Sequence, residues 1–121
     1  MRRLAGLKAL LVEDEAAVAL LLEDMLLDLG CEIVASAANL VAACRCAAEA
    51  ACDFALLDVN LAGQQVFPAA EILERRGIPF VFSTGYGVAG LPEAFRNRPT
   101  LTKPFMIEEL EQKIRTALDA G

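Results

Sequence analysis

The chain has 121 residues, is 56% hydrophobic and carries a formal net charge of −6. This length suits one domain with a buried core, and no apolar stretch reaches the ~18 residues that a membrane-spanning helix requires. The acidic balance argues against a nucleic-acid-binding surface, which needs a basic stripe, and no signal-peptide pattern follows the basic start. The sequence therefore predicts a cytoplasmic domain over residues 1–121 that binds neither nucleic acid nor membrane.

Apolar runs typical of buried strands alternate along the chain with segments of helical character. The predicted strands are Ala9–Val12, Ile33–Ser36, Phe54–Leu57, Phe80–Phe82 and Thr100–Thr102. The predicted helices are Ala16–Leu29, Leu40–Ala50, a third that begins near Pro68, and Met106–Leu118. Short continuous apolar strands that alternate with helices are typical of a parallel sheet with helices on both faces.

Local signals mark several helix ends. Gly30 is a good stop for the first helix, and Asn39 can cap the second. Pro68 suits the first turn of the third helix. We expect Glu15 to lie in the first turn of the first helix, where the helix dipole favours an acidic side chain.

The segment after the fourth predicted strand breaks the alternation. Residues 85–92 are rich in glycine and have the character of a loop. Only Glu93–Arg98 could be helical before Pro99, because proline ends a helix. The fourth helix should therefore be short or absent.

Polar side chains follow four of the predicted strands. Glu13 and Asp14 come after the first, Asp58 after the third, Thr84 after the fourth and Lys103 after the fifth. In an open parallel sheet, ligands bind beyond the carboxyl ends of the strands. Asp14 and Asp58 could bind Mg²⁺ directly, and Glu13 through water. A carboxylate can accept a phosphoryl group, whose charge a lysine and a hydroxyl could stabilise.

Each of these signals is weak alone. Acidic residues after a strand are usually solvated loop residues, and a lone aspartate such as Asp58 is more often a helix cap or a turn former. Their occurrence together at strand ends is what indicates a magnesium site for phosphoryl transfer. No zinc site is expected, because there is no histidine and the cysteine spacing is wrong. We interpret the cysteines as small buried side chains kept reduced: Cys31, Cys44, Cys46 and Cys52.

On these residues the chain resembles the receiver domain of two-component response regulators over essentially its whole length. The resemblance implies a flavodoxin-like, doubly wound α/β fold whose five-stranded parallel sheet has the order 2-1-3-4-5. It implies Mg²⁺ as cofactor and a histidine kinase or histidine phosphotransfer protein as partner. It also implies a metal contact from the backbone carbonyl of Asn60 and a cis peptide before Pro104. The family's acidic pair, phosphoacceptor, hydroxyl and lysine match Glu13, Asp14, Asp58, Thr84 and Lys103.

One position departs from the family pattern. Receivers usually carry an aromatic switch residue three positions before the lysine, and here that position is Thr100. The run from Pro79 to Gly87 is instead similar to the Phe-Ala-Thr-Gly (FAT-GUY) subclass of receivers, with Ser83 in place of the usual alanine. Tyr86 is then either the replacement switch residue, acting with Thr84, or a cover for the rim of the site.

The resemblance implies a stand-alone receiver that signals through an unknown output partner, or serves as a phosphate sink. It is not expected to be an enzyme beyond phosphorylating itself from a phosphodonor and losing that group again. One alternative is a pseudo-receiver that acts without phosphorylation. Another is an aspartyl-phosphate hydrolase, although such enzymes usually carry a second aspartate where this chain has Asn60.

Overall fold

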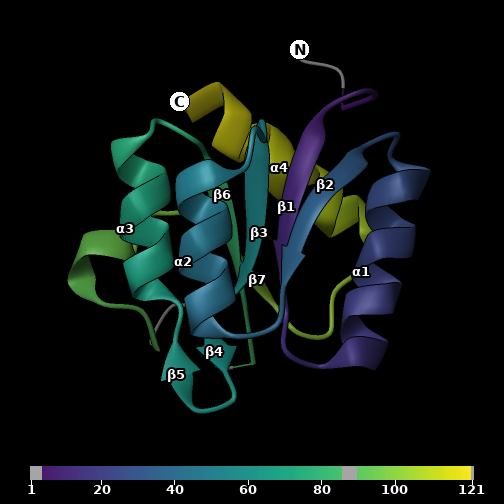
Figure 1. The fold of residues 1–121 in the computed structure, drawn as a ribbon. Coiled ribbons are helices and arrows are strands. Elements are labelled where there is room, and N and C mark those ends of the chain that lie inside the picture. The colour runs from purple at the N-terminus through teal and green to yellow at the C-terminus, as the bar shows by residue number, and fades with distance from the viewer. Residues whose placement is uncertain (1–3, 86–89, 121) are drawn as a thin grey trace.

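The computed structural model describes residues 4–85 and 90–120, which form a three-layer α/β domain (Figure 1). Its five-stranded parallel sheet has the order β2-β1-β3-β6-β7, which confirms the predicted doubly wound topology. The sheet strands are β1 (Lys8–Val12), β2 (Glu32–Ala37), β3 (Phe54–Asp58), β6 (Phe80–Thr84) and β7 (Thr100–Thr102). The helices are α1 (Ala16–Asp28), α2 (Leu40–Glu49), α3 (Phe67–Arg75) and α4 (Ile107–Ala120).

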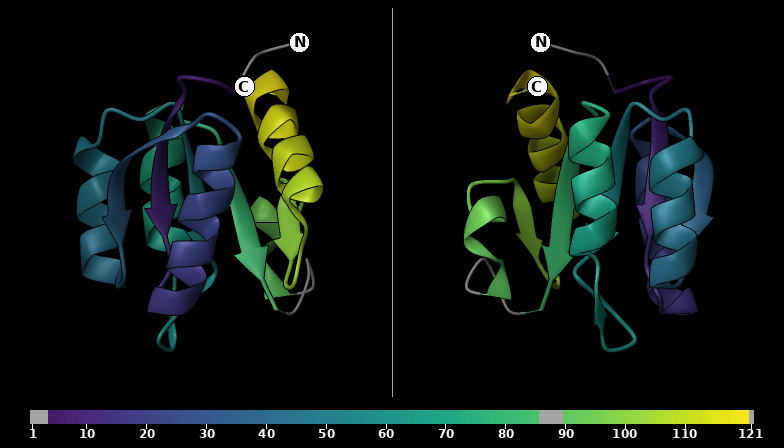
Figure 2. Two further views of the ribbon diagram at one scale, coloured as in Figure 1. Left: turned by 90° about the vertical axis from the view of Figure 1, so that its right-hand side faces the viewer. Right: turned by 60° about the vertical axis from the view of Figure 1, so that its left-hand side comes forward.

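Two hydrophobic cores lie on opposite faces of the sheet. Figure 2 shows the sheet between the two layers of helices. One core joins the sheet to α2 and α3, and the other joins it to α1 and α4. Neighbouring strand residues alternate between the two cores, as the pleat requires. In β6, for example, Phe82 packs in the first core and Val81 in the second.

The helix boundaries follow the local signals, with one correction. The Asn39 side chain caps α2 by accepting a hydrogen bond from the Ala42 N–H at 2.9 Å, and Pro68 lies in the first turn of α3. Gly30 follows the end of α1 with a φ of +90°, a conformation that glycine adopts readily. The placement of Glu15 inside α1 was wrong by one residue. Glu15 is the extended N-cap, and its backbone N–H donates to the Glu13 side chain.

The cap of α2 gives a direct stability prediction. Asn39→Ala should lower the free energy of unfolding by about 1 kcal/mol, because the Ala42 N–H loses its acceptor. Urea unfolding followed by circular dichroism measures the change. Ser36→Ala, at an exposed position on β2, is the matched control and should stay within about 0.5 kcal/mol of wild type. Equal midpoints for Asn39→Ala and the control would contradict the capping role.

A two-stranded antiparallel hairpin between β3 and α3 was not anticipated from the sequence. It consists of β4 (Asn60–Leu61) and β5 (Gln64–Gln65). Ala62 and Gly63 form its turn with φ values of +53° and +91°, the left-handed pair that tight hairpins favour. The side chain of Asn60 accepts a hydrogen bond from the Gly63 N–H at 2.8 Å and so fixes the turn.

The crossing from β6 to β7 contains no α-helix within the residues that the structure describes. Only a 3₁₀ turn, η2 (Glu93–Phe95), is present there, which confirms the short or absent fourth helix. Phe95 anchors this turn in the core, where its ring stacks on Phe67 with centroids 5.7 Å apart. It also meets Phe80 and Phe82 edge-on, at 6.0 and 5.6 Å.

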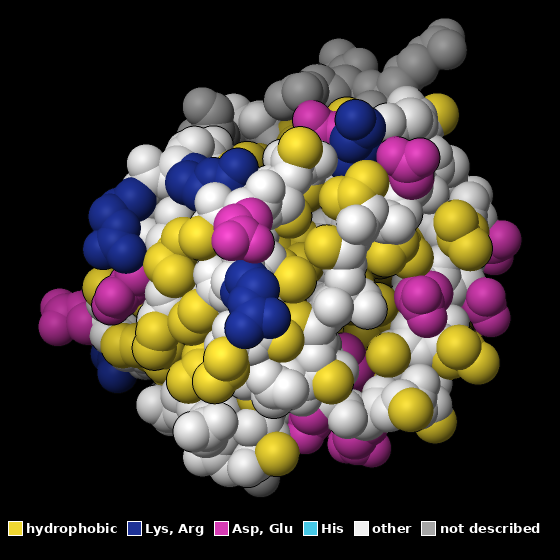
Figure 3. All heavy atoms as spheres, viewed as in Figure 1, with side chains coloured by type: hydrophobic (Ala, Val, Ile, Leu, Met, Phe, Trp, Pro, Cys, Tyr) yellow, Lys and Arg dark blue, Asp and Glu magenta, His cyan; other side chains and the backbone are white. Residues whose placement is uncertain are grey.

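The helix surfaces differ in character. α1 exposes Leu20, Leu21 and Leu27, and the charged side chains on the same side of the molecule in Figure 3 are mainly acidic. None of the helices in the described part of the chain is long and apolar enough to cross a membrane. The four cysteines form no disulfide with one another, and the prediction that they are buried is correct for Cys31 alone, because the other three are partly exposed.

Candidate functional site

The carboxyl ends of β1, β3, β6 and β7 bring the predicted site residues to one edge of the sheet. The register places Leu57 beside Val12 and Asp58 beside Ser83. Beyond the last pair of β6 and β7, the Lys103 N–H donates to the Thr84 carbonyl at 2.8 Å. Four separate segments of the chain thus meet at this edge because parallel strands all end on the same side.

Three carboxylates converge in the centre of the site. Glu13, Asp14 and Asp58 each offer one oxygen within 4.8 Å of the other two. Glu13 and Asp58 are only 3% and 7% exposed, and Asp14 is half-buried. Charged groups so close together repel, and hard oxygen ligands in such a cluster fit Mg²⁺. The residues present therefore suit a divalent cation.

Lys103 supplies the positive charge that faces this cluster. Its Nζ donates to Glu13 Oε1 at 3.0 Å and lies 3.5 Å from Asp58 Oδ2. Burial lowers the pKa of Lys103, but the hydrogen bond to Glu13 and the charges of Asp58 and Glu13 outweigh it, so the net pKa is raised. The peptide between Lys103 and Pro104 is cis, as predicted.

Asp58 has the most perturbed carboxyl group of the site. Burial, and then the negative charge of Glu13, raise its pKa to about 7. The Lys103 charge and the Asn60 N–H, which donates to Asp58 Oδ1 at 3.4 Å, oppose this rise. In the absence of a metal, Asp58 therefore titrates near neutral pH.

The β4–β5 hairpin contributes a contact that sequence reasoning missed. The Ala62 N–H at its turn donates to Asp14 Oδ2 at 2.9 Å. Burial raises the pKa of Asp14, but hydrogen bonds, first among them that from Ala62, outweigh burial and leave the pKa lowered. The hairpin thus stabilises the ionised form of Asp14, whereas the surroundings of Asp58 in the same cluster favour its neutral form. A backbone contact of this kind leaves no signal in residue types.

Thr84 and Asn60 line a small pocket of about 220 Å³ beside the cluster, together with the hairpin residue Gln65. Thr84 is buried, at 4% exposure. The direction of the Asn60 carbonyl toward a metal stays a prediction. Tyr86, the candidate switch residue, lies outside the described residues.

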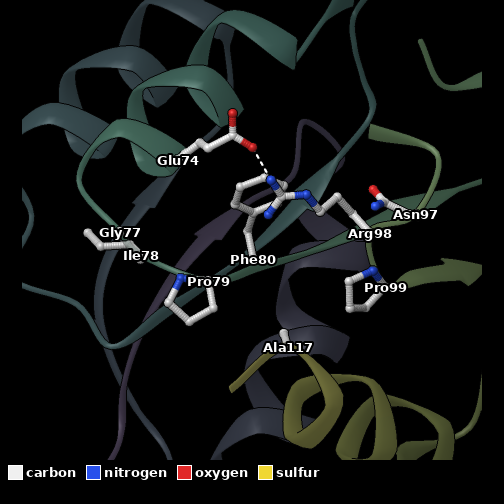
Figure 4. Close-up of a pocket in the computed structure, with 9 residues that line it drawn as sticks. All are labelled: Glu74, Gly77, Ile78, Pro79, Phe80, Asn97, Arg98, Pro99 and Ala117. Carbon is white, nitrogen blue, oxygen red and sulfur yellow. Dashed lines mark hydrogen bonds and ion pairs between the residues drawn. The ribbon is translucent and has the colours of Figure 1, made fainter. Parts of the chain in front are cut away.

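A larger hollow, of about 430 Å³, lies at the amino ends of β6 and β7, away from all the predicted site residues (Figure 4). Arg98 crosses it, forming an ion pair with Glu74 and placing its guanidinium 5.2 Å from the centre of the Phe80 ring. This arrangement ties α3 to the segment before β7. None of the predicted site residues that the structure describes lines this hollow.

The sequence matches the response regulator receiver domain family over residues 9–115. The chain belongs to the response regulator receiver family. It is therefore a component of two-component signalling, whose receivers interact with histidine kinases or phosphotransfer proteins. Among curated proteins, none matches the sequence significantly.

Solved structures of other receivers resemble this domain closely. SdrG from Sphingomonas melonis Fr1 is 37% identical with a TM-score of 0.83, over 98% of this chain and 99% of that one. The PhyR receiver domain of Erythrobacter litoralis is 30% identical with a TM-score of 0.82, over 95% and 92%. The receiver domain of the sensor histidine kinase PA1611 from Pseudomonas aeruginosa PAO1 is 25% identical with a TM-score of 0.79, over 95% and 99%. That last structure is described with a magnesium ion coordinated in its active-site cleft.

Proposed function

We propose that this receiver is a phosphorylation switch in which Asp58 accepts a phosphoryl group from a phosphohistidine. The donor is a histidine kinase or a histidine phosphotransfer protein. The observation that carries the proposal is the convergence of Glu13, Asp14 and Asp58 with the Lys103 ammonium at one edge of the sheet. The magnesium-bound receiver of PA1611 supports the same use of the cluster.

In the proposed reaction, an ionised Asp58 oxygen attacks the phosphorus of the phosphohistidine. The new bond is a P–O bond to Asp58, and the P–N bond breaks with its electrons going to the imidazole of the donor. Lys103 lies close enough to Asp58 to meet the transferred oxygens, and the Thr84 hydroxyl, at the end of the neighbouring strand β6, would stabilise them. Mg²⁺ held by Glu13, Asp14, Asp58 and the Asn60 carbonyl would supply further positive charge against the phosphoryl group.

The output of the switch is proposed to pass through a partner protein in the cytoplasm. Covalent addition of negative charge at Asp58 would draw Thr84 toward the phosphoryl oxygens and shift the segment that follows β6. Membership of the FAT-GUY subclass and a switching role for Tyr86 belong to this proposal. Their support is the run from Phe80 to Gly87 and the absence of an aromatic residue at Thr100.

Mass spectrometry of the intact protein tests the proposal. Incubation with Mg²⁺ and a small phosphodonor such as acetyl phosphate should add one phosphoryl group to wild type and none to Asp58→Asn. Asp28→Asn, at an exposed position on α1, is the matched control and should label like wild type. Chelation of Mg²⁺ should prevent labelling.

The alternatives predict other outcomes of the same experiment. A pseudo-receiver would gain no mass under any condition. A hydrolase would consume many equivalents of a phosphoester substrate with no labelled protein accumulating. Equal labelling of wild type and Asp58→Asn would place the phosphoacceptor elsewhere and overturn the assignment of Asp58.

A further inference from the structure

Ser83 carries an unpaired buried hydroxyl next to the proposed phosphoacceptor. Its Oγ is the one buried side-chain polar atom without a hydrogen-bond partner in residues 4–85 and 90–120. The residue is 1% exposed, so bulk water does not reach it. A buried hydroxyl without a partner disfavours folding by roughly tenfold or more in the folding equilibrium. A buried polar group without a partner calls for an explanation, and one explanation is a functional role in another state of the protein.

The sheet register places Ser83 directly beside Asp58. The two residues are paired across β3 and β6, and the Val59 N–H donates to the Ser83 carbonyl at 3.0 Å. Adjacent strands in a sheet lie about 4.7–4.9 Å apart. The backbones of Ser83 and Asp58 are therefore about one strand spacing apart, beside the carboxylate that would receive the phosphoryl group.

The alternation of side chains puts both residues on the same face of the sheet. Val81 and Leu56 pack in the core against α1 and α4, and Ser83 and Asp58 each lie two residues further along the same strands. Glu13 follows Leu11 of that core in the same way. The side chains of Glu13, just beyond the end of β1, Asp58 on β3 and Ser83 on β6 thus form one row in that order.

The other polar groups of this row already have partners. The Lys103 ammonium is shared between Glu13 and Asp58, at 3.0 and 3.5 Å. Thr84 follows Phe82, which packs in the opposite core, so it approaches the strand ends from the other face. Ser83 and Thr84 are consecutive and therefore place hydroxyls on the two faces of β6 at the same strand end.

We propose that Ser83 is a positioning residue whose hydroxyl donates a hydrogen bond to the Asp58 side chain when that side chain is phosphorylated. This inference rests on the proposed function. Phosphorylation adds oxygens and negative charge within reach of the unpaired hydroxyl, and a hydrogen bond to a charged acceptor is stronger than one to a neutral group. Ser83 then holds the phosphoryl group from the face opposite Thr84.

Thermal unfolding of wild type and Ser83→Ala, with and without Mg²⁺ plus beryllium fluoride as the phosphoryl mimic, tests this role. In the metal-free state Ser83→Ala should melt above wild type, because the variant lacks the unpaired hydroxyl. The stabilisation by Mg²⁺ and beryllium fluoride should be smaller for the variant, with roughly tenfold weaker binding of beryllium fluoride. A merely structural role would shift both states equally.

Val81→Ala is the matched control, since it truncates a side chain on the same face of β6. Its melting temperature should fall by the same amount in both states, with unchanged affinity for beryllium fluoride. Equal affinities for wild type and Ser83→Ala would overturn the inference while leaving the phosphorylation switch intact. A metal-free Ser83→Ala that melts below wild type would also overturn it. If Mg²⁺ and beryllium fluoride do not raise the melting temperature of the wild-type protein, the result would contradict the proposed function itself.

Discussion

Without Mg²⁺, Asp58→Asn is expected to be more stable than wild type at neutral and alkaline pH. Asp58 is buried, and its pKa is raised to about 7 by burial and by the charge of Glu13. Ionising such a group in the folded state opposes folding, by roughly 2–4 kcal/mol for a carboxyl shifted this far. Asparagine has a similar shape and removes the charge. Urea unfolding in chelator measures the difference.

The pH dependence of this effect has a definite sign. The unfolded chain releases the Asp58 proton near its usual pKa of 3.8, whereas the folded chain keeps it until about 7. Between these values the folded state binds more protons, so wild-type stability falls as the pH rises. The advantage of Asp58→Asn should be small near about pH 4 and largest above about pH 7. As a control, Asp24→Asn, exposed on α1, should show no such trend. If the stability of the two variants changed with pH in the same way, the result would contradict a destabilising buried charge at Asp58.

Mg²⁺ should stabilise the wild-type fold, because the cation binds the assembled carboxylates and not the unfolded chain. The gain is about 2.7 kcal/mol at a Mg²⁺ concentration one hundred times the Kd, or roughly 10 °C in melting temperature for a domain of this size. Metal binding needs ionised ligands, so the gain should be larger at about pH 8 than at about pH 6 as Asp58 loses its proton. Thermal melts at the two pH values measure it.

Asp14→Asn separates metal binding from a general effect of ionic strength. The variant removes one carboxylate from the cluster and should lose most of the Mg²⁺-induced shift. Glu23→Gln, on α1 and next to the site but outside the cluster of three carboxylates, should keep it. A shift that persists in Asp14→Asn, or that NaCl of equal ionic strength reproduces, would count against a specific site.

The parts of the fold that the sequence predicted correctly are those with a strong local pattern. Strands β1, β3 and β6 contain short apolar runs, so their positions followed from composition to within about two residues. The prediction that Asp58 and Lys103 lie close together needed no knowledge of side-chain contacts, because both residues follow strands of the same parallel sheet. The short crossing before β7 was foreseeable because Pro99 limits any helix there.

The missed features depend on contacts between distant segments. Two-residue strands have no measurable periodicity, so the β4–β5 hairpin was invisible, and its Ala62-Gly63 turn lacks the Asn-Gly signal of a tight hairpin. The contact from Ala62 to Asp14 joins residues 48 positions apart through a backbone group. The unpaired state of Ser83 likewise follows from three-dimensional packing, since a serine in a strand ordinarily finds a partner.

The replacement of a fourth helix by η2 should give this edge of the domain its own opening equilibrium. Leu91 and Phe95 are the buried side chains of residues 90–98, and returning two such side chains to water costs about 3–6 kcal/mol. Unfolding a whole domain typically costs about 5–15 kcal/mol. Residues 91–95 should therefore detach in roughly one molecule in 10²–10⁴ while the sheet stays intact. Amide protons there would exchange with solvent through this local event, at a rate that substitutions in the distant core against α1 leave unchanged.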